Sequence, residues 1–495
     1  MKAASTFLYT HKLKLLFFAF LYYLKNNYRI LFFQLFKLTS SGKKKIRDKR
    51  DSAKQIIKKS FKTNFSYNFD KLPEHSMESK KLGFIVNMRE NNVSNKISGC
   101  VYINDKNLEN TLKTINNKYL FSNPLHPDIF PELIKMESET IKMVGNLFDL
   151  PSTGGGNITT GGTESTILAL KAYKKLYMEG TLFSFFKPEV LCTRTVHAAV
   201  NKACELLDLR IIYVDLDDDY VMDIYDLESK ISPRTCVIIG SAPCFPYGLM
   251  DPINKIGDIA RYYSIPFHVD ACLGGFITQY HNDLKLSFND NIQSLSVDPH
   301  KFGLAPKGSS ILLWKDNKYR HYQYFVVSDW TGGIYASVSL PGSRVGSQIA
   351  TTWATLLSNG YIKYESMAKK IREKTEDFAE NTKKIPDFEV IGNPDVNVVA
   401  FRNTKYSVGQ LSNYLEKHNW NINILQNPIC LHICITPKNI DNIDSLQLLL
   451  EKFNEAEKDE KEENITAIYG MAATIPDKSI IDDLVCYYLD ETTSL

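Results

Sequence analysis

The sequence predicts an α/β fold with a mostly parallel sheet that is covered by helices on both faces. The first observation is a set of short apolar runs separated by longer stretches with helical periodicity. The second is the pattern of residues 131–150, where Ile134, Ile141, Val144 and Leu147 fall on one helical face. The runs that we interpret as buried strands are 190–192, 211–214, 236–239, 266–269, 295–297 and 311–314.

Two further helices and a second domain follow from the same pattern. After a Gly-rich turn, residues 163–177 are predicted to form a helix, and a long helix is predicted around residues 358–381. Beyond it, short apolar segments alternate with helical stretches, which predicts a smaller α+β domain at the C-terminal end. Its expected strands lie at residue 390 and at 398–401, 421–425 and 431–435.

Length and composition set broad limits on the function. A chain of 495 residues is long enough for two or three domains with a large buried core. The formal net charge of only +3 gives no reason to expect nucleic acid as a partner. Nine cysteines, an odd number, are scattered through segments predicted to be buried. This distribution favours reduced thiols in a cytosol-facing protein over a disulfide framework.

Cys430, His432 and Cys434 have a spacing that suggests a metal site, but they lie in an unusual place for one. Apolar residues alternate with them from 429 to 435, as in a buried strand. Tetrahedral zinc usually takes ligands that are carried on turns. We therefore expect a buried strand there, and no metal.

The N-terminal segment differs from the rest of the chain. Two apolar runs, residues 15–24 and 30–36, are separated by basic residues, and neither reaches the roughly 20 apolar residues of a bilayer-spanning helix. Together they would form a weak span or an amphipathic helix in the membrane surface; a cleaved signal peptide and a helix packed on the protein body are the alternatives. We expect membrane association, with the basic stretch 43–62 keeping the body on the cytoplasmic side.

The segment Thr160-Gly161-Gly162-Thr163 opens the helix predicted at 163–177. Glycines before a helix leave backbone N–H groups accessible, and the positive end of the helix dipole favours a phosphate. Thr163 can cap the helix and also donate a hydrogen bond to that phosphate. An ordinary helix cap has the same pattern, so the segment indicates a phosphate site only in combination with the other candidate residues.

Three polar side chains directly follow predicted strands, where open α/β sheets bind ligands. Asp270 can pair with a protonated pyridine nitrogen, and His197 can stack on an aromatic ring. Lys301 can form a Schiff base, and burial is expected to lower its pKa and keep part of the amine free. Together with a phosphate site, these residues predict that the chain binds pyridoxal 5'-phosphate.

This combination resembles the fold-type I pyridoxal-phosphate enzymes of the group II decarboxylase-like branch. Longer motifs are similar to those of the sphingosine-1-phosphate lyases, and the similarity extends from about Ser98 to the end of the chain. The motifs are Asn123-Pro-Leu-His126-Pro-Asp, His268-Val-Asp-Ala-Cys-Leu-Gly-Gly275, Ala305-Pro-Lys307-Gly-Ser-Ser310, Asp329-Trp-Thr-Gly-Gly-Ile-Tyr335-Ala-Ser, Gly342-Ser-Arg344 and Ala467-Ile-Tyr-Gly-Met471.

The resemblance implies a cofactor role for each residue of the site. Lys301 would carry the cofactor, Asp270 would pair with its ring nitrogen, and His197 would stack on its ring. Because some of the phosphate ligands would come from a neighbouring subunit, the resemblance also implies an obligate homodimer with shared active sites. The residues implied for the cofactor phosphate are Gly162, Thr163 and His300, with Gly342 and Ser343 of the neighbouring subunit.

The resemblance also implies a substrate with a phosphate group. A phosphomonoester needs several cationic or polar donors. The residues implied for it are Tyr102, Asn123, His126 and Lys307, of which Tyr102 and Lys307 would also be catalytic, together with the three residues around the ring.

The reaction implied by the resemblance is retro-aldol cleavage of the C2–C3 bond of sphingosine 1-phosphate or a related phosphorylated long-chain base. The products would be a long-chain aldehyde and phosphoethanolamine, in sphingolipid breakdown. An alternative is an amino-acid decarboxylase of the same branch, which shares the Asp-Pro-His-Lys string ending at Lys301. A non-catalytic, membrane-associated scaffold on the same fold is a third reading.

A domain layout follows from the same resemblance. A large cofactor-binding domain at 131–357, with a mostly parallel seven-stranded sheet, would precede a small C-terminal α+β domain at 358–495. Residues 63–130 would contribute to the active site and the dimer. Residues 1–62 would attach the protein to the endoplasmic reticulum membrane, with the catalytic domain in the cytosol.

Overall fold

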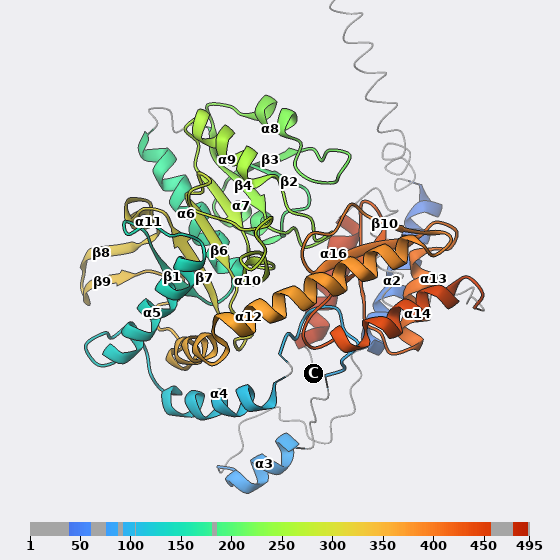
Figure 1. Cartoon of the computed structure of the whole chain (residues 1–495), viewed down its shortest axis with the longest axis horizontal. Helices are drawn as coiled ribbons and strands as arrows, with labels where there is room; N and C mark the ends of the chain where they lie inside the picture. Colours follow the sequence, from blue (N-terminus) through green and yellow to red (C-terminus); the bar gives the residue numbers. More distant parts are fainter. Residues whose placement is uncertain are drawn as a thin grey trace, which may run out of the picture.

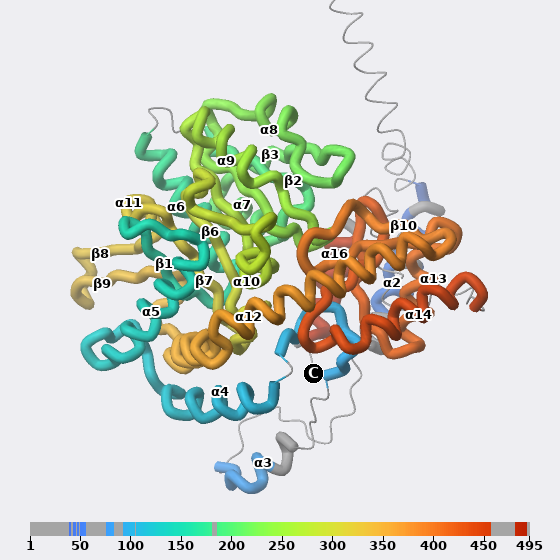
Figure 2. Tube along the Cα trace, viewed as in Figure 1, coloured from blue at the N-terminus to red at the C-terminus, as the bar shows by residue number. Residues whose placement is uncertain are grey.

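The described part of the chain forms a large α/β body and a smaller body beside it, and the long helix α12 (Gly346–Lys383) runs from one to the other (Figure 1). Figure 2 follows the trace from the blue N-terminal helices through the green and yellow large body to the red C-terminal helices. The apolar runs at 15–24 and 30–36 and the motif at 467–471 lie outside the described residues. The computed structural model describes residues 39–60, 76–87, 93–103, 105–180, 186–456 and 479–493.

A seven-stranded sheet forms the centre of the large body. Its strands are β1 (Gly155–Thr159), β2 (Glu189–Thr193), β3 (Arg210–Val214), β4 (Thr235–Ser241), β5 (Phe267–Asp270), β6 (Ser294–Val297) and β7 (Ser310–Trp314). Their order in space is β1-β7-β6-β5-β4-β2-β3. The pairs from β3 to β6 are parallel, while β7 runs antiparallel to both of its neighbours. The predicted mostly parallel, seven-stranded sheet is therefore confirmed.

Every apolar run predicted for this sheet lies within one of its strands, apart from Pro266, which directly precedes β5. The sequence pattern does not predict β1, because its glycines and the turn residues before it are typical of a loop. Glycine is needed in β1 for close pairing: a Cβ on Gly156 would lie 2.7 Å from the carbonyl oxygen of Leu312 in β7.

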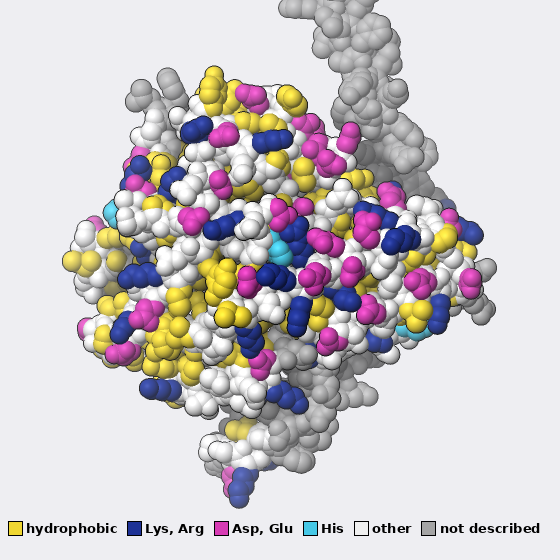
Figure 3. Space-filling model, in the orientation of Figure 1, with side chains coloured by type: hydrophobic (Ala, Val, Ile, Leu, Met, Phe, Trp, Pro, Cys, Tyr) yellow, Lys and Arg dark blue, Asp and Glu magenta, His cyan; other side chains and the backbone are white. Residues whose placement is uncertain are grey.

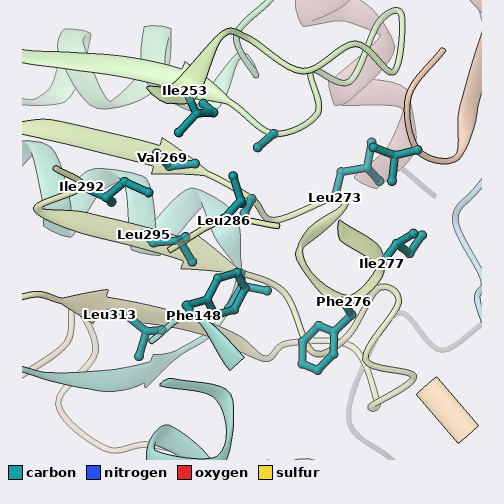
Figure 4. Close-up of a cluster of buried hydrophobic side chains, with 14 of the residues drawn as sticks. Phe148, Ile253, Val269, Leu273, Phe276, Ile277, Leu286, Ile292, Leu295 and Leu313 are labelled. Carbon is teal, nitrogen blue, oxygen red and sulfur yellow. The ribbon is translucent and has the colours of Figure 1, made fainter. Parts of the chain in front are cut away.

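Helices cover both faces of the sheet and bury two separate apolar clusters against it. One cluster includes Phe148, Val269 and Phe276, which are labelled in Figure 4. The other, on the α6 side, includes Tyr173 and Trp314. Both faces are buried, as predicted for a parallel sheet. The helices are α5 (Pro131–Leu147), α6 (Gly162–Gly180), α7 (Ala199–Leu206), α8 (Ile224–Lys230), α9 (Ile253–Tyr262), α10 (Gly275–Thr278) and α11 (Asn317–Gln323).

The predicted helices agree with α5 and α6, but α12 begins twelve residues before the expected start at Ser358. The apolar pattern breaks at Gly360, whose backbone is non-helical (φ 61°, ψ 177°) inside α12. The sequence therefore shows only the half of the helix that follows the break. The domain division predicted at 357/358 falls close to this kink, and it stays a prediction.

The smaller body contains the predicted C-terminal α+β unit. Its strands are β10 (Phe388–Val390), β11 (Val398–Asn403), β12 (Asn423–Leu425) and β13 (Cys430–Cys434), and its helices are α13 (Val408–Lys417), η1 (Ile440–Asn442) and α14 (Ile443–Phe453). The sheet order is β10-β11-β13-β12, with antiparallel pairs. Every residue of β13 is buried, which confirms the strand predicted there. Within the described ranges, no group of three or more His, Cys, Asp or Glu side chains is arranged to hold a metal ion.

An N-terminal segment connects the small body to the large one. Ile97 forms a parallel bridge with Asn421, and the Ser98 hydroxyl accepts a hydrogen bond from the Cys434 N–H at 2.9 Å. Asp105 then caps helix α4 (Lys106–Tyr119), because its carboxylate accepts two N–H groups of the first turn. Helix α4 packs against α12. The segment therefore holds Tyr102 at the junction of the two bodies.

The remaining described helices are α2 (Ser40–Ser60), α3 (Ser79–Asn87) and α16 (Ser479–Thr493). Helix α2 contains much of the basic stretch and packs against α16, with Ala53 and Leu484 buried. None of the helices in the described part of the chain is both long and apolar enough to cross a membrane.

A hairpin of β8 (Phe325–Trp330) and β9 (Gly333–Ser337) projects from the large body (Figure 1). The sequence pattern does not predict it, because its side chains do not alternate between apolar and polar. Phe325, Val326, Trp330 and Ile334 are exposed on it. Exposed apolar side chains grouped in this way are typical of interaction surfaces.

Candidate active site

Polar residues from several strand ends meet around one cavity at the carboxyl edge of the large sheet. The cavity has a volume of about 330 Å³ and lies between the ends of β4, β5 and β6 and the first turn of α6. Open α/β sheets bind ligands at this edge. The structure thus brings together most residues predicted for the cofactor. Those that line the cavity are Gly162, Thr163, His197, Asp270, His300 and Lys301.

The turn before α6 approaches the cavity closely because it contains glycine. A Cβ on Gly162 would lie 2.8 Å from the Cys272 sulfur and 3.1 Å from the nearer carboxylate oxygen of Asp298, so a larger residue does not fit. Thr163 follows in the first turn of the helix, where the positive end of the helix dipole favours an anion. This arrangement suits a phosphate group.

Lys301 forms an ion pair with a carboxylate that the sequence analysis did not single out. Its Nζ lies 3.0 Å from Oδ2 of Asp298, which is almost completely buried at the end of β6. Burial lowers the pKa of Lys301, but Asp298 together with Cys272, Tyr102 and Asp270 raises it by more, and the pKa lies above its ordinary value. The expectation of a lowered pKa for Lys301 is therefore wrong. The amine is an ammonium group paired with Asp298.

Asp270 ends β5 with its side chain at the cavity, where its Oδ1 accepts the Cys272 N–H at 3.0 Å. Behind it on the same strand, His268 is buried between two serine hydroxyls, with Nδ1 2.8 Å from Ser294 and Nε2 3.3 Å from Ser296. Burial lowers the pKa of His268 to about 4, so this imidazole is neutral. His268 therefore does not form an ion pair with the Asp270 carboxylate.

His197 lies at the cavity with its ring held from two sides. Its Nδ1 accepts the Ala199 N–H at 3.1 Å, and its ring lies edge-on to Phe245 at 6.1 Å between centroids. Phe245 in turn lies edge-on to His432 of β13 at 4.7 Å. The small body thus contributes to the position of the predicted ring-stacking residue.

Tyr102 and Lys307 meet beside the cavity, as expected for two members of the substrate-phosphate set. The Lys307 ammonium lies 4.6 Å from the centre of the Tyr102 ring, and Phe302 packs edge-on against that ring at 5.0 Å. Burial and the nearby Lys301 lower the pKa of Lys307, while burial raises the pKa of Tyr102. An anion bound here would offset the repulsion between the ammonium groups of Lys307 and Lys301.

Two of the other predicted ligands, Asn123 and Ser343, are bonded to each other. The Asn123 amide donates to the Ser343 hydroxyl at 3.0 Å, and its oxygen accepts the Arg344 N–H at 3.1 Å. His126 is exposed. Within the described chain, Asn123, His126, Gly342 and Ser343 are not among the residues that line the cavity around Lys301. These four residues lie outside the cofactor cavity of their own chain, as do Tyr102 and Lys307.

A buried ion pair fixes the segment that carries Gly342 and Ser343. Arg344 donates to both carboxylate oxygens of Glu137 in α5, at 2.7 and 2.9 Å, and both side chains are largely buried. Glu137 also accepts the Ile158 N–H of β1 at 3.1 Å. A two-pronged pair of this kind holds the segment in one orientation against the large sheet.

We expect Arg344→Met to lower the free energy of unfolding by about 3–5 kcal/mol, because Glu137 would remain buried without its cation. Urea denaturation followed by circular dichroism measures the change. Arg372→Met is the control, since Asp283, the partner of Arg372, is exposed, and its expected cost is below about 1 kcal/mol. Equal losses in the two variants would show that the Arg344 pair does not anchor the segment.

Some site residues were missed by the sequence analysis. Asp298 follows β6 just as Asp270 follows β5, so the same strand-end rule applies to it. Glu164 stands one helical turn after Thr160 and accepts hydrogen bonds from its N–H and hydroxyl, a spacing visible in the sequence. Phe245 lies in the loop after β4, and no sequence pattern marks its contact with His197.

The residues present fit pyridoxal phosphate. A volume of about 330 Å³ lies within the usual range for ligand sites, roughly 300–1,000 Å³. Lys301 supplies an amine, Asp270 a carboxylate for a ring nitrogen, and the start of α6 an anion site. Each would serve a different part of the same cofactor.

Comparisons with known proteins agree with this interpretation. The family model described as "Pyridoxal-dependent decarboxylase conserved domain" matches residues 110–404. The chain is 36% identical to the sphingosine-1-phosphate lyase of Dictyostelium discoideum over 466 residues, covering 90% of this chain and 86% of that protein. It is also 36% identical to sphingosine-1-phosphate lyase 1 of Rattus norvegicus, over 81% of this chain and 72% of that protein.

A solved structure shows the same relationship. The sphingosine-1-phosphate lyase of Burkholderia pseudomallei K96243 superposes with a TM-score of 0.77 and 28% sequence identity. The match covers 87% of this chain and 98% of that one. The chain therefore belongs to the sphingosine-1-phosphate lyase family of pyridoxal-dependent enzymes.

Proposed function

We propose that the chain cleaves sphingosine 1-phosphate, or a related phosphorylated long-chain base, between C2 and C3 to give a long-chain aldehyde and phosphoethanolamine. The relatives it resembles over most of its length are named for such a lyase. The observation that carries the proposal is the Lys307 ammonium over the Tyr102 ring, next to Lys301. A cation in that position suits a substrate phosphate.

Each residue around the cavity would have a different role toward the cofactor. The cofactor, when bound, supplies an electron sink for the bond that breaks next to the substrate amine. Lys301 would link the cofactor to the chain, and Asp270 would hold a proton at the ring nitrogen. His197, kept in place by Phe245, would cover one face of the ring.

Orientation decides which substrate bond breaks. Lys307 would bind the substrate phosphate and so fix the position of the C2–C3 bond relative to the cavity. Tyr102 is protonated, because burial raises its pKa, and its hydroxyl can donate a hydrogen bond to the same phosphate. A decarboxylase needs a group that positions a carboxylate, and the Lys307–Tyr102 pair fits the larger charge of a phosphate better.

Identification of the products tests the proposal. The purified full-length chain, with pyridoxal phosphate added, is incubated with a phosphorylated long-chain base, and in parallel with aromatic and acidic amino acids. Equal amounts of aldehyde and phosphoethanolamine would support the lyase. Release of carbon dioxide from an amino acid, without aldehyde from the base, would replace it by the decarboxylase. Bound cofactor with neither product would favour the scaffold.

We expect Lys307→Gln to raise the KM for the phosphorylated base by about 10- to 100-fold, the usual effect of losing one hydrogen bond to a charged group. Steady-state kinetics measure KM, and titration with pyridoxal phosphate checks that cofactor affinity is unchanged. Lys318→Gln is the control, because the Lys318 ammonium also lies over a tyrosine ring, that of Tyr319, but on the exposed surface. An unchanged KM would remove Lys307 from the substrate-phosphate site.

We also propose that the active form is a homodimer in which each chain completes the other's site. Four predicted ligands do not line the cavity of their own chain: Asn123, His126, Gly342 and Ser343. The two segments that carry them contain exposed apolar residues. Figure 3 shows hydrophobic side chains gathered over α5, the start of α12 and the hairpin. A solution mass of two 56.5 kDa chains is expected, and a mass of one chain would contradict the dimer. The exposed apolar residues of this surface are Phe121, Ile129, Phe325, Val326, Trp330, Ile334, Leu340 and Val345.

We propose that the N-terminal segment attaches the protein to the endoplasmic reticulum membrane, with the catalytic body in the cytosol. The support comes from the apolar runs at 15–24 and 30–36, followed by the basic helix α2, on which Lys43, Lys44 and Lys45 are exposed. Fractionation of cells that express the full chain, or a chain without residues 1–38, tests this. Loss from the membrane fraction only in the shortened chain is expected; equal distribution would contradict the proposal.

A further inference from the structure

Glu164 connects two segments that are far apart in the sequence. It lies in the first turn of α6 and is almost completely buried. Its Oε2 accepts the N–H of Thr160 at 2.7 Å and the hydroxyl of Thr160 at 2.6 Å. Its Oε1 accepts the N–H of Leu340 at 2.8 Å. Each carboxylate oxygen therefore holds a different segment.

The first segment belongs to the cofactor cavity. Thr160 lines that cavity together with Gly162 and Thr163, the residues predicted to bind the cofactor phosphate. Glu164 lines it as well, but its oxygens are bonded to Thr160 and Leu340. It thus shapes the phosphate turn through Thr160.

The second segment carries Gly342 and Ser343. Within this segment the Ser339 hydroxyl donates to the Pro341 carbonyl at 3.1 Å, which closes a turn around Leu340. Asn123 and the Arg344 pair hold its far end. In the proposed dimer this segment completes the cofactor site of the neighbouring subunit.

We propose that Glu164 is a positioning residue that serves two cofactor sites, its own through Thr160 and its neighbour's through Leu340. The inference rests on the proposed homodimer. A carboxylate near a phosphate site is repulsive unless donors offset its charge, and here three donors and the start of a helix do so. Glutamine has a single acceptor oxygen, so Glu164→Gln cannot keep both connections.

The effect of Glu164 on its own cofactor site and its effect on the neighbour's site can be separated in heterodimers. In such a dimer only one of the two sites can link the cofactor. One subunit carries Lys301→Ala and a distinct affinity tag, so that only the other subunit can bind the cofactor covalently. Glu164→Gln is placed either on the subunit that retains Lys301 (the cis dimer) or on the subunit that lacks it (the trans dimer). The readout is the visible absorbance of the lysine-linked cofactor as pyridoxal phosphate is titrated.

We expect the apparent cofactor dissociation constant to rise about tenfold in both dimers, because the amide oxygen can accept only one of the two backbone N–H groups and accepts it more weakly than a carboxylate does. Glu139→Gln in either position is the control, because Glu139 bonds to Trp353 and does not line the cavity. Weakening in the cis dimer alone, or in neither dimer, would overturn the shared role while leaving the homodimer intact. Recovery of monomers only would overturn the homodimer and the inference together.

A second variant keeps the test decisive if Glu164→Gln does not fold. Thr160→Ala removes one donor to Glu164 and leaves the Leu340 connection in place. It is expected to weaken cofactor binding in the cis dimer and not in the trans dimer. Equal weakening in both dimers would contradict the division of the two oxygens between two sites.

Discussion

Lys301→Ala is expected to abolish the proposed lyase activity, with kcat reduced at least about 1,000-fold, the order seen when a covalent catalytic group is removed. The variant should also lose the visible absorbance of lysine-linked cofactor. The physical reason is that Lys301 is the amine at the cavity, at the end of β6 and opposite the anion site of α6. Product formation from a phosphorylated long-chain base measures the loss.

Lys301→Ala also leaves Asp298 buried without its cation, which destabilises the folded protein. This loss of stability must be distinguished from the loss of the amine that links the cofactor. Lys301→Arg provides that separation, because arginine keeps a positive charge beside Asp298 but remains protonated and cannot link the cofactor. We expect Lys301→Arg to be as inactive as Lys301→Ala while retaining more of the wild-type thermal stability. Activity in either variant within tenfold of wild type would show that another group carries the cofactor.

Asp270→Asn is expected to lower kcat by about 100- to 1,000-fold, the size associated with the loss of one preorganised electrostatic group. The amide has nearly the same shape but no charge with which to hold a proton at the ring nitrogen. His268 behind it is neutral, since burial lowers its pKa to about 4, and it cannot take over this role. Steady-state kinetics together with cofactor titration separate lost chemistry from lost binding.

Asp258→Asn is the matched control, because Asp258 is exposed on α9 and its carboxylate pairs with the exposed Arg261. It should leave kcat within about twofold of wild type, since exposed ion pairs contribute little. If Asp270→Asn behaves like this control, the carboxylate is not the partner of the ring nitrogen. The cavity would then hold the cofactor in another orientation.

Much of the large domain could be predicted because its strands are buried on both faces. Such strands appear as short apolar runs, and the runs that contain Val190, Leu295 and Ile311 all lie in the sheet. The same rule located Asp270 and Lys301, since polar residues that end parallel strands meet at one edge. Sequence patterns record this arrangement because burial on both faces makes each strand a continuous apolar run.

Other features depend on contacts between distant segments, which no local pattern records. The sequence does not show that Asp298 raises the pKa of Lys301, because that effect depends on the 3.0 Å separation of their side chains. It does not show that Asn123 bonds to Ser343. The motifs give these residues as one set, and their contacts with one another appear only in the folded chain.

Covalent trapping shows which lysine carries the cofactor of this enzyme. The full-length protein is loaded with pyridoxal phosphate, reduced with borohydride, digested and sequenced by mass spectrometry. We expect the reduced cofactor on Lys301, and fragmentation of the peptide distinguishes it from the nearby Lys307. Modification of a different lysine, or of none, would contradict the site described around β5, β6 and α6.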